Sequence, residues 1–169
     1  PELLFAPKQD YRHSLFLALH GYQVDAIDRD AKALAHLAST ARGHSLTGIT
    51  TREIDLEQPS PPDPGLGKDM YDVIVVFFYL YRSLIPSLID ALKPGGVLAY
   101  ETFTIDNYFH HKHPKRWEFC LAPNELLRLT SSLQVLHYDE GGHADSRTSG
   151  LTYTAQLLAH KPLRSSQPA

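Results

Sequence analysis

The 169-residue sequence has few of the features that mark a secreted, membrane or nucleic-acid-binding protein. Its single cysteine, Cys120, excludes an internal disulfide framework and fits a reducing compartment, so we expect a cytoplasmic location. No apolar run approaches the length of a membrane span. The net charge of −3 provides no overall attraction to nucleic acid or to an anionic membrane. Any partner must therefore be argued from local features.

Glycine is missing from a place where nucleotide-binding folds usually have it. Residues 3–30, "LLFAPKQDYRHSLFLALHGYQVDAIDRD", have the pattern of a strand, a loop, a helix and a second strand. In such units glycines give the loop dihedral angles that are closed to other residues and let its backbone approach a cofactor. Between Ala6 and Arg12 this chain reads "PKQDY" instead. Three interpretations remain. A cofactor could be bound in a different way, with Arg12 or Lys8 binding its carboxylate. Alternatively, the fold could work without a cofactor as a binding or scaffold protein, or the chain could be a truncated or altered relative of the proteins that contain such glycines.

The length and the hydrophobic pattern indicate one domain over residues 1–169. Because the sequence starts at Pro1 without a recognisable leader, we expect that amino-terminal residues have been processed or trimmed. Helical spacing predicts helices at 13–20, 31–42, 84–92 and 123–131, with Gly21 and Gly43 after the first two. Runs of β-branched and aromatic residues predict strands at 3–6, 22–27, 46–54, 71–78, 96–103, 133–138 and 151–159.

The order of these elements predicts an α/β fold. The continuous apolar run at 73–78 is typical of a strand that is covered on both faces. The last two strands are joined by the turn-rich "DEGGHADSRTSG" without a helix, so they should pair antiparallel. Long irregular segments are expected at "EQPSPPDPGLGKDM" and "TIDNYFHHKHPKRWEFCLA". We therefore predict a doubly wound, mostly parallel seven-stranded sheet with a C-terminal antiparallel hairpin, a Rossmann-like architecture.

Two long stretches carry a resemblance to a known family. These are "RHSLFLALHGYQVDAIDRD" and "YDVIVVFFYLYRSLIPSLIDALKPGGVLAYETFT", and the most specific element is the Lys-Pro-Gly-Gly turn feeding the hydrophobic strand of "LKPGGVLAYETF". With the terminal hairpin, the chain resembles the class I S-adenosylmethionine-dependent methyltransferases, in particular the tellurite-resistance type of small-molecule methyltransferases. The resemblance covers nearly the whole chain. It implies S-adenosyl-L-methionine as cofactor and a small-molecule methyl acceptor, with no metal.

The resemblance implies cofactor contacts at the carboxyl ends of the strands, where open α/β sheets bind their ligands. Asp28 lies at such an end and can accept hydrogen bonds from both ribose hydroxyls, but Asp28 or Asp30 could instead cap the helix at 31–42. By resemblance, Asp55 corresponds to the residue that contacts the adenine amino group; the alternative is a solvated turn carboxylate. The expected cofactor-binding residues are Arg12, Asp28, Arg29, Asp55, Leu56 and Phe78.

The resemblance places the methyl-transfer chamber at the ends of the fourth and fifth strands. Aromatic faces at Phe78 and Tyr79 suit a sulfonium cation, because the ring quadrupole attracts positive charge, although aromatic residues there equally suit a buried core. Glu101, in "YETFT", is a carboxylate among apolar neighbours and is expected to have a partner or a function. We expect Tyr79 and Glu101 to be the catalytic residues, with Glu101 positioning or deprotonating the acceptor. The alternative for Glu101 is a hydrogen bond to a nearby loop.

The histidine-rich stretch "HHKHPKRW" admits three functions. Its three histidines could bind a transition metal, but their spacing matches no structural zinc pattern. Its basic residues could contact phosphate, although one short patch on an acidic protein is a small electrostatic footprint. A loop that covers the substrate is favoured, with Asn107, Tyr108 and Phe109 as acceptor-site candidates by position.

The principal hypothesis is a methyltransferase that aligns nucleophile, methyl group and sulfur for in-line displacement. The alternative is a non-catalytic pseudo-methyltransferase that serves as a binding or scaffold protein. A nicotinamide-dependent reductase is disfavoured, because the glycine fingerprint on which it relies is absent and the terminal hairpin is foreign to it.

Overall fold

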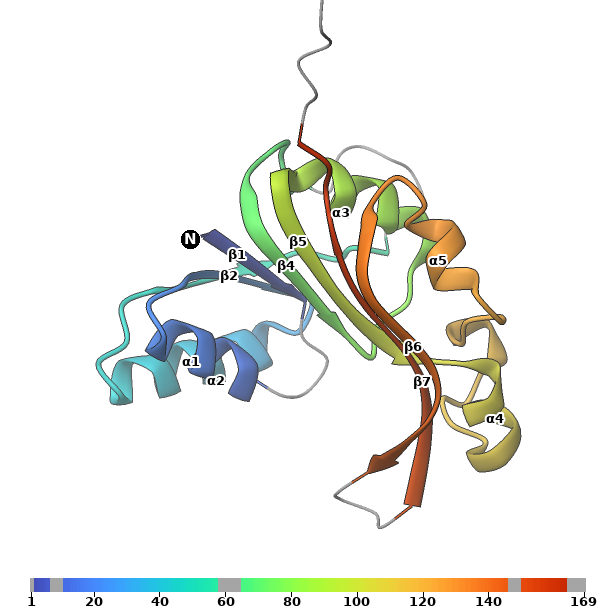
Figure 1. Ribbon diagram of the computed structural model, residues 1–169. Coiled ribbons are helices and arrows are strands. Elements are labelled where there is room, and N and C mark those ends of the chain that lie inside the picture. The colour runs from blue at the N-terminus through green and yellow to red at the C-terminus, as the bar shows by residue number, and fades with distance from the viewer. Residues whose placement is uncertain (1, 7–10, 58–64, 146–149, 164–169) are drawn as a thin grey trace, which may run out of the picture.

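A computed structural model describes residues 2–6, 11–57, 65–145 and 150–163 of the chain. Its strands form one sheet in the order β3-β2-β1-β4-β5-β7-β6 (Figure 1). The strands β1 to β5 pair in parallel, whereas β7 runs antiparallel to both β5 and β6. The α/β class and the antiparallel terminal hairpin are therefore confirmed. The strands are β1 (Glu2–Ala6), β2 (Gln23–Asp28), β3 (Ile49–Glu53), β4 (Tyr71–Phe77), β5 (Leu92–Phe103), β6 (Gln134–Asp145) and β7 (Gly150–His160).

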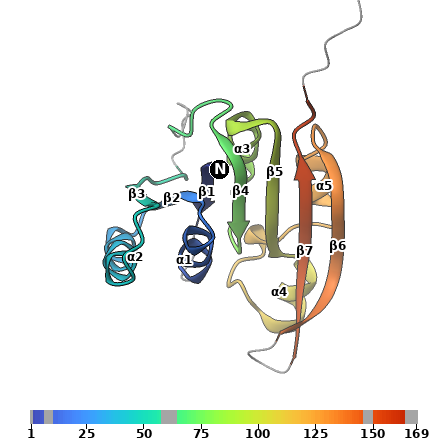
Figure 2. The ribbon, with the colours of Figure 1, turned by 60° about the vertical axis from the view of Figure 1, so that its left-hand side comes forward.

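Helices cover the two faces of the sheet unequally (Figure 2). On one face, α1 (Arg12–Leu19) and α2 (Ala31–Gly43) pack against β2 and β3. On the other face, the short η1 (Arg82–Leu84), α3 (Ile85–Ala91) and α5 (Glu125–Leu129) lie over the middle of the sheet and the hairpin. All four predicted helices are present, with ends shifted by a few residues.

Two of the predicted helix ends can be compared with the structure. Gly21 follows α1 with a φ of 84°, a left-handed conformation that glycine adopts at low cost, as expected for the end of a helix. Gly43, in contrast, is the last residue of α2, and the left-handed residue after this helix is Ser45, with a φ of 56°. The placement of Gly43 beyond the second helix was therefore wrong, because the helix ends one residue later than predicted.

The segment 104–122, predicted as irregular, contains α4 (Ile105–His111) and η2 (Trp117–Phe119). The helix α4 is short and histidine-rich, and tertiary contacts stabilise it: the Ile105 N–H donates to the Leu121 carbonyl, and Tyr153 donates to the Asn107 side chain. Similarly, β6 continues to Asp145, because residues expected to form a turn pair with β7. Partners that are distant in sequence thus override the local turn composition.

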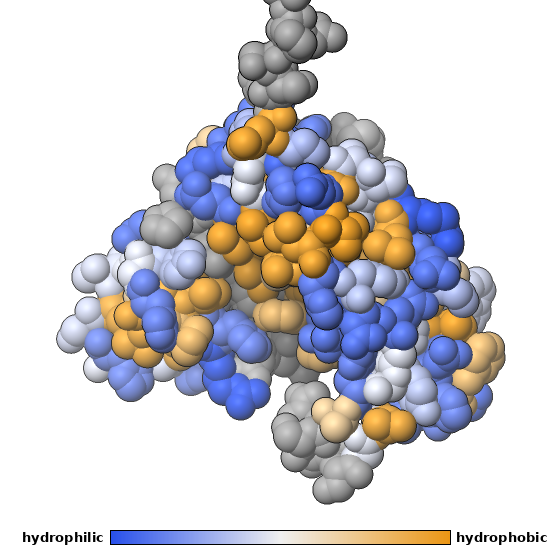
Figure 3. All heavy atoms as spheres, viewed as in Figure 1, coloured by the Kyte–Doolittle hydropathy of each residue, from blue (hydrophilic) through white to orange (hydrophobic). Residues whose placement is uncertain are grey.

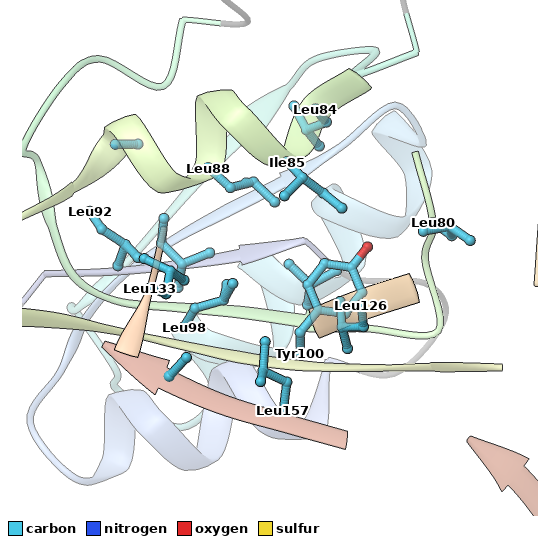
Figure 4. Close-up of a cluster of buried hydrophobic side chains, with 14 of the residues drawn as sticks. Leu80, Leu84, Ile85, Leu88, Leu92, Leu98, Tyr100, Leu126, Leu133 and Leu157 are labelled. Carbon is cyan, nitrogen blue, oxygen red and sulfur yellow. The ribbon is translucent and has the colours of Figure 1, made fainter. Parts of the chain in front are cut away.

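The main hydrophobic core lies between the sheet and the α3 side. Among the residues whose burial is described, it contains nineteen buried side chains, including Leu88 of α3, Leu98 of β5 and Leu126 of α5. Figure 4 shows the α3 side chains directed toward the leucines and Tyr100 that rise from the sheet. The α1–α2 side has two small clusters, in which the described part of the chain contributes five buried side chains. Most of the apolar burial, and hence most of the hydrophobic stabilisation, belongs to the α3 side.

The opposite face of β5, β7 and β6 carries no helix among the described residues (Figure 1). Figure 3 shows hydrophobic side chains exposed in the middle of this view. Leu158, on β7, is 38% exposed and belongs to this face. Ala99 and Glu101 of β5 point to the same face, because side chains alternate along a strand and the buried Leu98 and Tyr100 point to the α3 side.

Candidate functional site

The carboxyl ends of the parallel strands meet at one edge of the sheet. Asp28 ends β2, Glu53 ends β3, Phe77 ends β4 and Phe103 ends β5. In sheets of this kind the ligand lies beyond that edge, where the strand order reverses. The strand β1 ends at the same edge with Ala6, and the residues that follow it, Pro7, Lys8, Gln9 and Asp10, lie outside the described residues. The site is therefore built from the ends of β2 to β5.

Asp28 is not the cap of α2. The Asp30 side chain caps that helix, because its Oδ1 accepts hydrogen bonds from the backbone N–H groups of Lys32 and Ala33, at 3.0 and 3.1 Å. Asp28 Oδ1 accepts from the Asp30 N–H at 2.9 Å, which fixes the carboxylate at the end of β2. Among the described residues, its Oδ2 makes no hydrogen bond. Asp30 is therefore the residue that caps α2, and Asp28 has one carboxylate oxygen that could accept a hydrogen bond from a ligand.

The end of β3 supplies a second carboxylate. Asp55 Oδ1 accepts from the Glu57 N–H at 3.0 Å, a local turn contact of the kind expected for its alternative role. Arg29, which follows Asp28, lies 3.6 Å from Glu57, so an ion pair joins the segments after β2 and β3. Leu56 packs against the main core. The predicted set Asp28, Arg29, Asp55 and Leu56 is therefore gathered at one corner of the edge, whereas Arg12 is an exposed residue at the start of α1.

The Tyr79 hydroxyl belongs to the same corner. It is buried and has no hydrogen-bond partner among the described residues. Burial raises the pKa of Tyr79 above its usual range, and the charges of Glu57 and Asp55 raise this pKa further. Tyr79 thus carries a neutral hydroxyl next to the carboxylates after β3. Tyr79, which was expected to line the methyl-transfer chamber, thus lies near Glu57 and Asp55.

A second buried hydroxyl lies beside Asp28. The Tyr11 side chain packs against Ala26, Leu34 and Leu37, and its hydroxyl has no partner among the described residues. Burial raises the pKa of Tyr11 to about 12, and the nearby charges of Asp28 and Asp30 contribute. A buried polar group without a partner is unfavourable by about 1–3 kcal/mol. Two such hydroxyls beside two carboxylates fit a nucleoside, whose sugar and base can both donate and accept hydrogen bonds.

Three aromatic rings lead away from the end of β4; we call them the aromatic row Phe78–Phe103–His113. The ring centroids of Phe78 and Phe103 are 5.0 Å apart, and the His113 ring meets the Phe103 ring edge-on at 5.0 Å. Phe78 has a φ of 53°, which is rare for a bulky residue, and its N–H donates to the Glu101 carbonyl at 2.7 Å. Such backbone strain is concentrated at ligand sites.

Glu101 has one engaged oxygen. Its Oε1 accepts from Thr154 Oγ1 at 3.0 Å and from Gln156 Nε2 at 3.1 Å, both on β7. The alternative that Glu101 bonds a nearby loop is therefore wrong, because its partners belong to the neighbouring strand. In the part of the chain that the structure describes, Oε2 accepts no hydrogen bond. Glu101 of β5 pairs with Phe77 of the neighbouring strand β4, and Phe103 follows Glu101 by two residues on the same strand. Aromatic side chains therefore lie on two sides of Glu101.

Hydrogen bonds join the segment after β5 to Arg82 and to β7. Arg82 forms a bidentate ion pair with Glu125, with N–O distances of 2.6 and 2.9 Å. Its guanidinium also donates hydrogen bonds to the backbone carbonyls of Glu118 and Cys120. The Asn107 amide donates to the His113 carbonyl at 2.7 Å and accepts from the Tyr153 N–H at 3.0 Å. Asn107 is 2% exposed, so it holds the segment and is not an acceptor contact.

The three histidines of this segment have different neighbours. The His110 ring stacks on Tyr153 with a centroid distance of 4.5 Å, and His111 Nε2 lies 2.8 Å from the Leu151 carbonyl. Within the described ranges, no three His, Cys, Asp or Glu side chains are arranged to hold a metal ion. No helix in those ranges is both long enough and apolar enough to span a membrane.

Sequence reasoning missed three residues that shape this edge: Tyr11, Arg82 and Phe103. Phe103 could have been found, because it lies two positions after Glu101 and therefore points to the same face of the strand. Arg82 carried no signal, since its partner Glu125 is 43 residues away in sequence. Tyr11 stood out only as a bulky residue in the segment without glycine.

Comparisons with known proteins agree with this geometry. The family model of the tellurite resistance protein TehB matches residues 8–149. The probable S-adenosyl-L-methionine-dependent methyltransferase TehB of Haemophilus influenzae is 30% identical over 137 residues, which are 76% of this chain and 44% of that protein. The crystal structure of Haemophilus influenzae TehB has a TM-score of 0.73 at 24% identity, covering 95% of this chain and 57% of that one.

Two further solved structures share the fold. A crystal structure of an S-adenosylmethionine-dependent methyltransferase from Methanosarcina mazei has a TM-score of 0.70 at 20% identity, covering 96% of this chain and 93% of the other. The [4+2]-cyclase SpnF has a TM-score of 0.71 at 16% identity, covering 96% and 74%. At these identities the similarity is one of fold, and this fold is described both for a methyltransferase and for a cyclase.

The strand order and the carboxylates at the ends of β2 and β3 define an α/β protein of the methyltransferase-like class. The chain belongs to the tellurite resistance protein TehB family, whose model spans most of its length. It covers less than half the length of the curated relative that it matches.

Proposed function

We propose that this chain binds S-adenosyl-L-methionine and transfers its methyl group to a small-molecule nucleophile. The observation that carries the proposal is the Asp28 carboxylate at the end of β2. Asp30, and not Asp28, caps the helix α2, so Asp28 is not needed as the cap. A carboxylate with an available oxygen at this position accepts hydrogen bonds from ribose hydroxyls. The family membership supports the choice of cofactor, because the curated relative carries S-adenosyl-L-methionine dependence in its name.

From the order of the strands we propose a part of the ligand for each residue. The ribose would lie at Asp28, and the adenine would lie next to it, at Asp55 and Leu56. There the Tyr79 hydroxyl, buried without a partner, would bond the base, and Arg29 would border the pocket through its ion pair with Glu57. The methionine part would extend past the loop after β1 toward Phe78. Arg12, at the start of α1, is proposed to face the methionine carboxylate.

The chemistry of the site follows from its aromatic end. When bound, the cofactor would supply a methyl group on a sulfonium, which is already a good electrophile. The Phe78 ring lowers the energy of a nearby cation through its quadrupole without removing a proton. Glu101, one strand farther along the sheet, would position the acceptor or accept its proton. We propose Glu101 as the catalytic residue and reassign Tyr79 from catalysis to cofactor binding.

Isothermal titration calorimetry with S-adenosyl-L-methionine and S-adenosylhomocysteine tests the proposal. We expect saturable binding of both, and Asp28→Asn should weaken it about tenfold or more, because it removes a charge-assisted hydrogen bond. Asp139→Asn is the matched control, since Asp139 is a 56% exposed carboxylate on β6, at the opposite edge of the sheet from β2; its effect should stay within about twofold. Absence of binding at millimolar ligand would defeat the proposal.

Tyr79→Phe gives a second, independent readout. Removing an unpartnered buried hydroxyl should leave the melting temperature of the free protein unchanged or raise it, because an unfavourable buried group is lost. The same change should weaken cofactor binding, because the base loses a partner. A variant that loses stability but keeps its affinity would show that the hydroxyl serves the fold and not the ligand.

A non-catalytic role is the second candidate, and the sequence between Ala6 and Arg12 favours it. That segment, "PKQDY", contains no glycine, and a backbone without glycine approaches a cofactor less closely. In this case the fold would serve as a scaffold, and the calorimetry above would detect no binding. The cytoplasmic location remains a prediction that rests on the single cysteine, Cys120.

A further inference from the structure

We propose that the methyl acceptor is a small amine, bound as an ammonium ion by Glu101 Oε2 with its carbon chain against Phe103 and Phe78. This inference rests on the proposed methyltransferase function and adds the class of substrate. It is carried by the position of Glu101 on the sheet edge, by the hydrogen bonds of its carboxylate and by the aromatic rings around it.

The position of Glu101 assigns it to the acceptor and not to the cofactor. The strand order places β2, with Asp28, three strands away from β5, with Glu101. Neighbouring strands are about 4.8 Å apart, so about 14 Å separates the two strand ends. A ligand that begins with its sugar at Asp28 and runs past β1 and β4 reaches Phe78 before Glu101. The carboxylate therefore lies on the far side of the transferred group.

The hydrogen bonds of the carboxylate leave one oxygen for a ligand. Thr154 and Gln156 both donate to Oε1, so the side chain is held in one orientation by β7. Oε2 makes no hydrogen bond within the described part of the chain. A fixed carboxylate with one available oxygen is an acceptor of N–H donors, and its negative charge favours a cationic donor.

The surroundings of this oxygen select a cation that also has an apolar part. Phe77 lies beside Glu101 on β4, and Phe103 lies two residues ahead on the same face of β5. The Phe103 ring contacts both Phe78 and His113, which extends the aromatic surface. Aromatic faces attract ammonium ions through the ring quadrupole.

A small alkyl amine matches this set of groups. Like lysine, it is protonated at neutral pH and reaches the site as an ammonium ion. Before the nitrogen can act as a nucleophile, the proton must pass from the ammonium nitrogen to Glu101 Oε2, which leaves the lone pair on nitrogen and a neutral carboxyl group. Glu101 thus both recruits the cationic acceptor and accepts its proton.

The test compares three probes of similar shape: propylamine, propanethiol and propionate. Binding to the full chain is followed by NMR chemical-shift titration, which needs no cofactor. We expect propylamine to shift the resonances of Phe103 and Gln156, and propionate to leave them unchanged. With S-adenosyl-L-methionine present, release of S-adenosylhomocysteine should depend on the amine. Binding or methylation of the thiol or of propionate in preference to the amine would overturn the inference.

Glu101→Gln is the decisive variant, because its amide oxygen can still accept from Thr154 and Gln156 while the charge is lost. The Kd for propylamine should rise about tenfold or more, with the cofactor Kd unchanged. The matched control is Asp139→Asn: Asp139 is 56% exposed and is separated from Glu101 by β7, so its effect should stay within about twofold. Equal effects of both variants would show a general charge effect and refute direct contact.

The failure of this inference is distinguishable from the failure of the proposed function. If the cofactor binds but propylamine shifts no resonance near Glu101, the acceptor class is wrong and the proposed function stands. If propylamine binds at Glu101 but calorimetry detects no cofactor, the amine site stands and the proposed function is wrong.

Discussion

The two faces of the sheet differ in how much of the fold they hold together. Of the side chains that the structure describes, nineteen are buried in one continuous core on the α3 side, whereas five are buried in two separate clusters on the α1–α2 side. The proposed cofactor residues are divided between the two sides: Asp28 lies at the start of α2 and Tyr11 packs on the α1–α2 side, whereas Leu56 and Tyr79 pack against the main core. A bound nucleoside would therefore contact both sides, and its largest stabilising effect is expected on the α1–α2 side, which buries less apolar surface by itself.

The largest expected effect comes from a matched pair of leucine truncations. Leu88 on the α3 side and Leu37 on the α1–α2 side are 1% and 0% exposed. Leu88→Ala should lower the free energy of unfolding by about 3–4 kcal/mol and Leu37→Ala by about 2–3 kcal/mol, because a larger cluster loses more contacts and collapses less around the cavity. Urea denaturation of both variants measures the difference. If Leu37→Ala lowered the free energy of unfolding as much as Leu88→Ala or more, the α3 side would not contribute more to stability than the α1–α2 side.

The ion pair between Arg82 and Glu125 predicts a pH-dependent difference on the α3 side. Hydrogen bonding to Arg82 lowers the pKa of Glu125 below its ordinary value of 4.5. A lowered folded-state pKa stabilises the protein above pH of about 4.5, and this contribution is lost as the pH falls through the folded-state pKa. At pH 7, Glu125→Gln should cost about 1 kcal/mol, a modest value because the Arg82 side chain is 39% exposed.

Thermal unfolding of Glu125→Gln and the unmodified protein between pH 7 and pH 3 checks this prediction. The gap between the two melting temperatures should narrow as the pH falls. A gap that is constant across this range would show that the ion pair does not contribute through its charge.

The smallest expected effect is at the cap of α2. Asp30→Ala should lower the free energy of unfolding by about 1 kcal/mol, because the N–H groups of Lys32 and Ala33 lose their acceptor. Hydrogen exchange should quicken in the first turn of α2 and stay unchanged in α3. Asp30→Asn is the control, since asparagine caps helices nearly as well. Faster exchange in both helices would show that the two sides unfold together.

Much of the fold could be predicted because its signals are local. The apolar run at 73–78 indicated the buried strand β4, and helical spacing indicated α1, α2 and α3. The prediction failed where distant partners decide the structure. The helix α4 depends on contacts with Leu121 and Tyr153, and the second half of β6 depends on its pairing with β7.

The candidate site was predictable only in outline. The sequence placed Asp28, Asp55, Phe78 and Glu101 at strand ends, and the structure brings these ends to one edge. It could not indicate that the Tyr79 hydroxyl faces the carboxylates after β3, because the rotation of a side chain after a strand depends on its packing. For the same reason, the acceptor role expected for Asn107 was wrong: the chain uses its amide to join α4 to β7.

The sequence by itself determined the alternation of strands and helices, the antiparallel ending and the acidic residues at strand ends, because these follow from the periodicity and turn chemistry of neighbouring residues. Only the tertiary structure decided which side of the sheet holds the main core, which oxygen of Glu101 is left for a ligand and how Arg82 reaches Glu125. These features depend on contacts between segments far apart in the chain, and such contacts leave no periodic signal in the sequence.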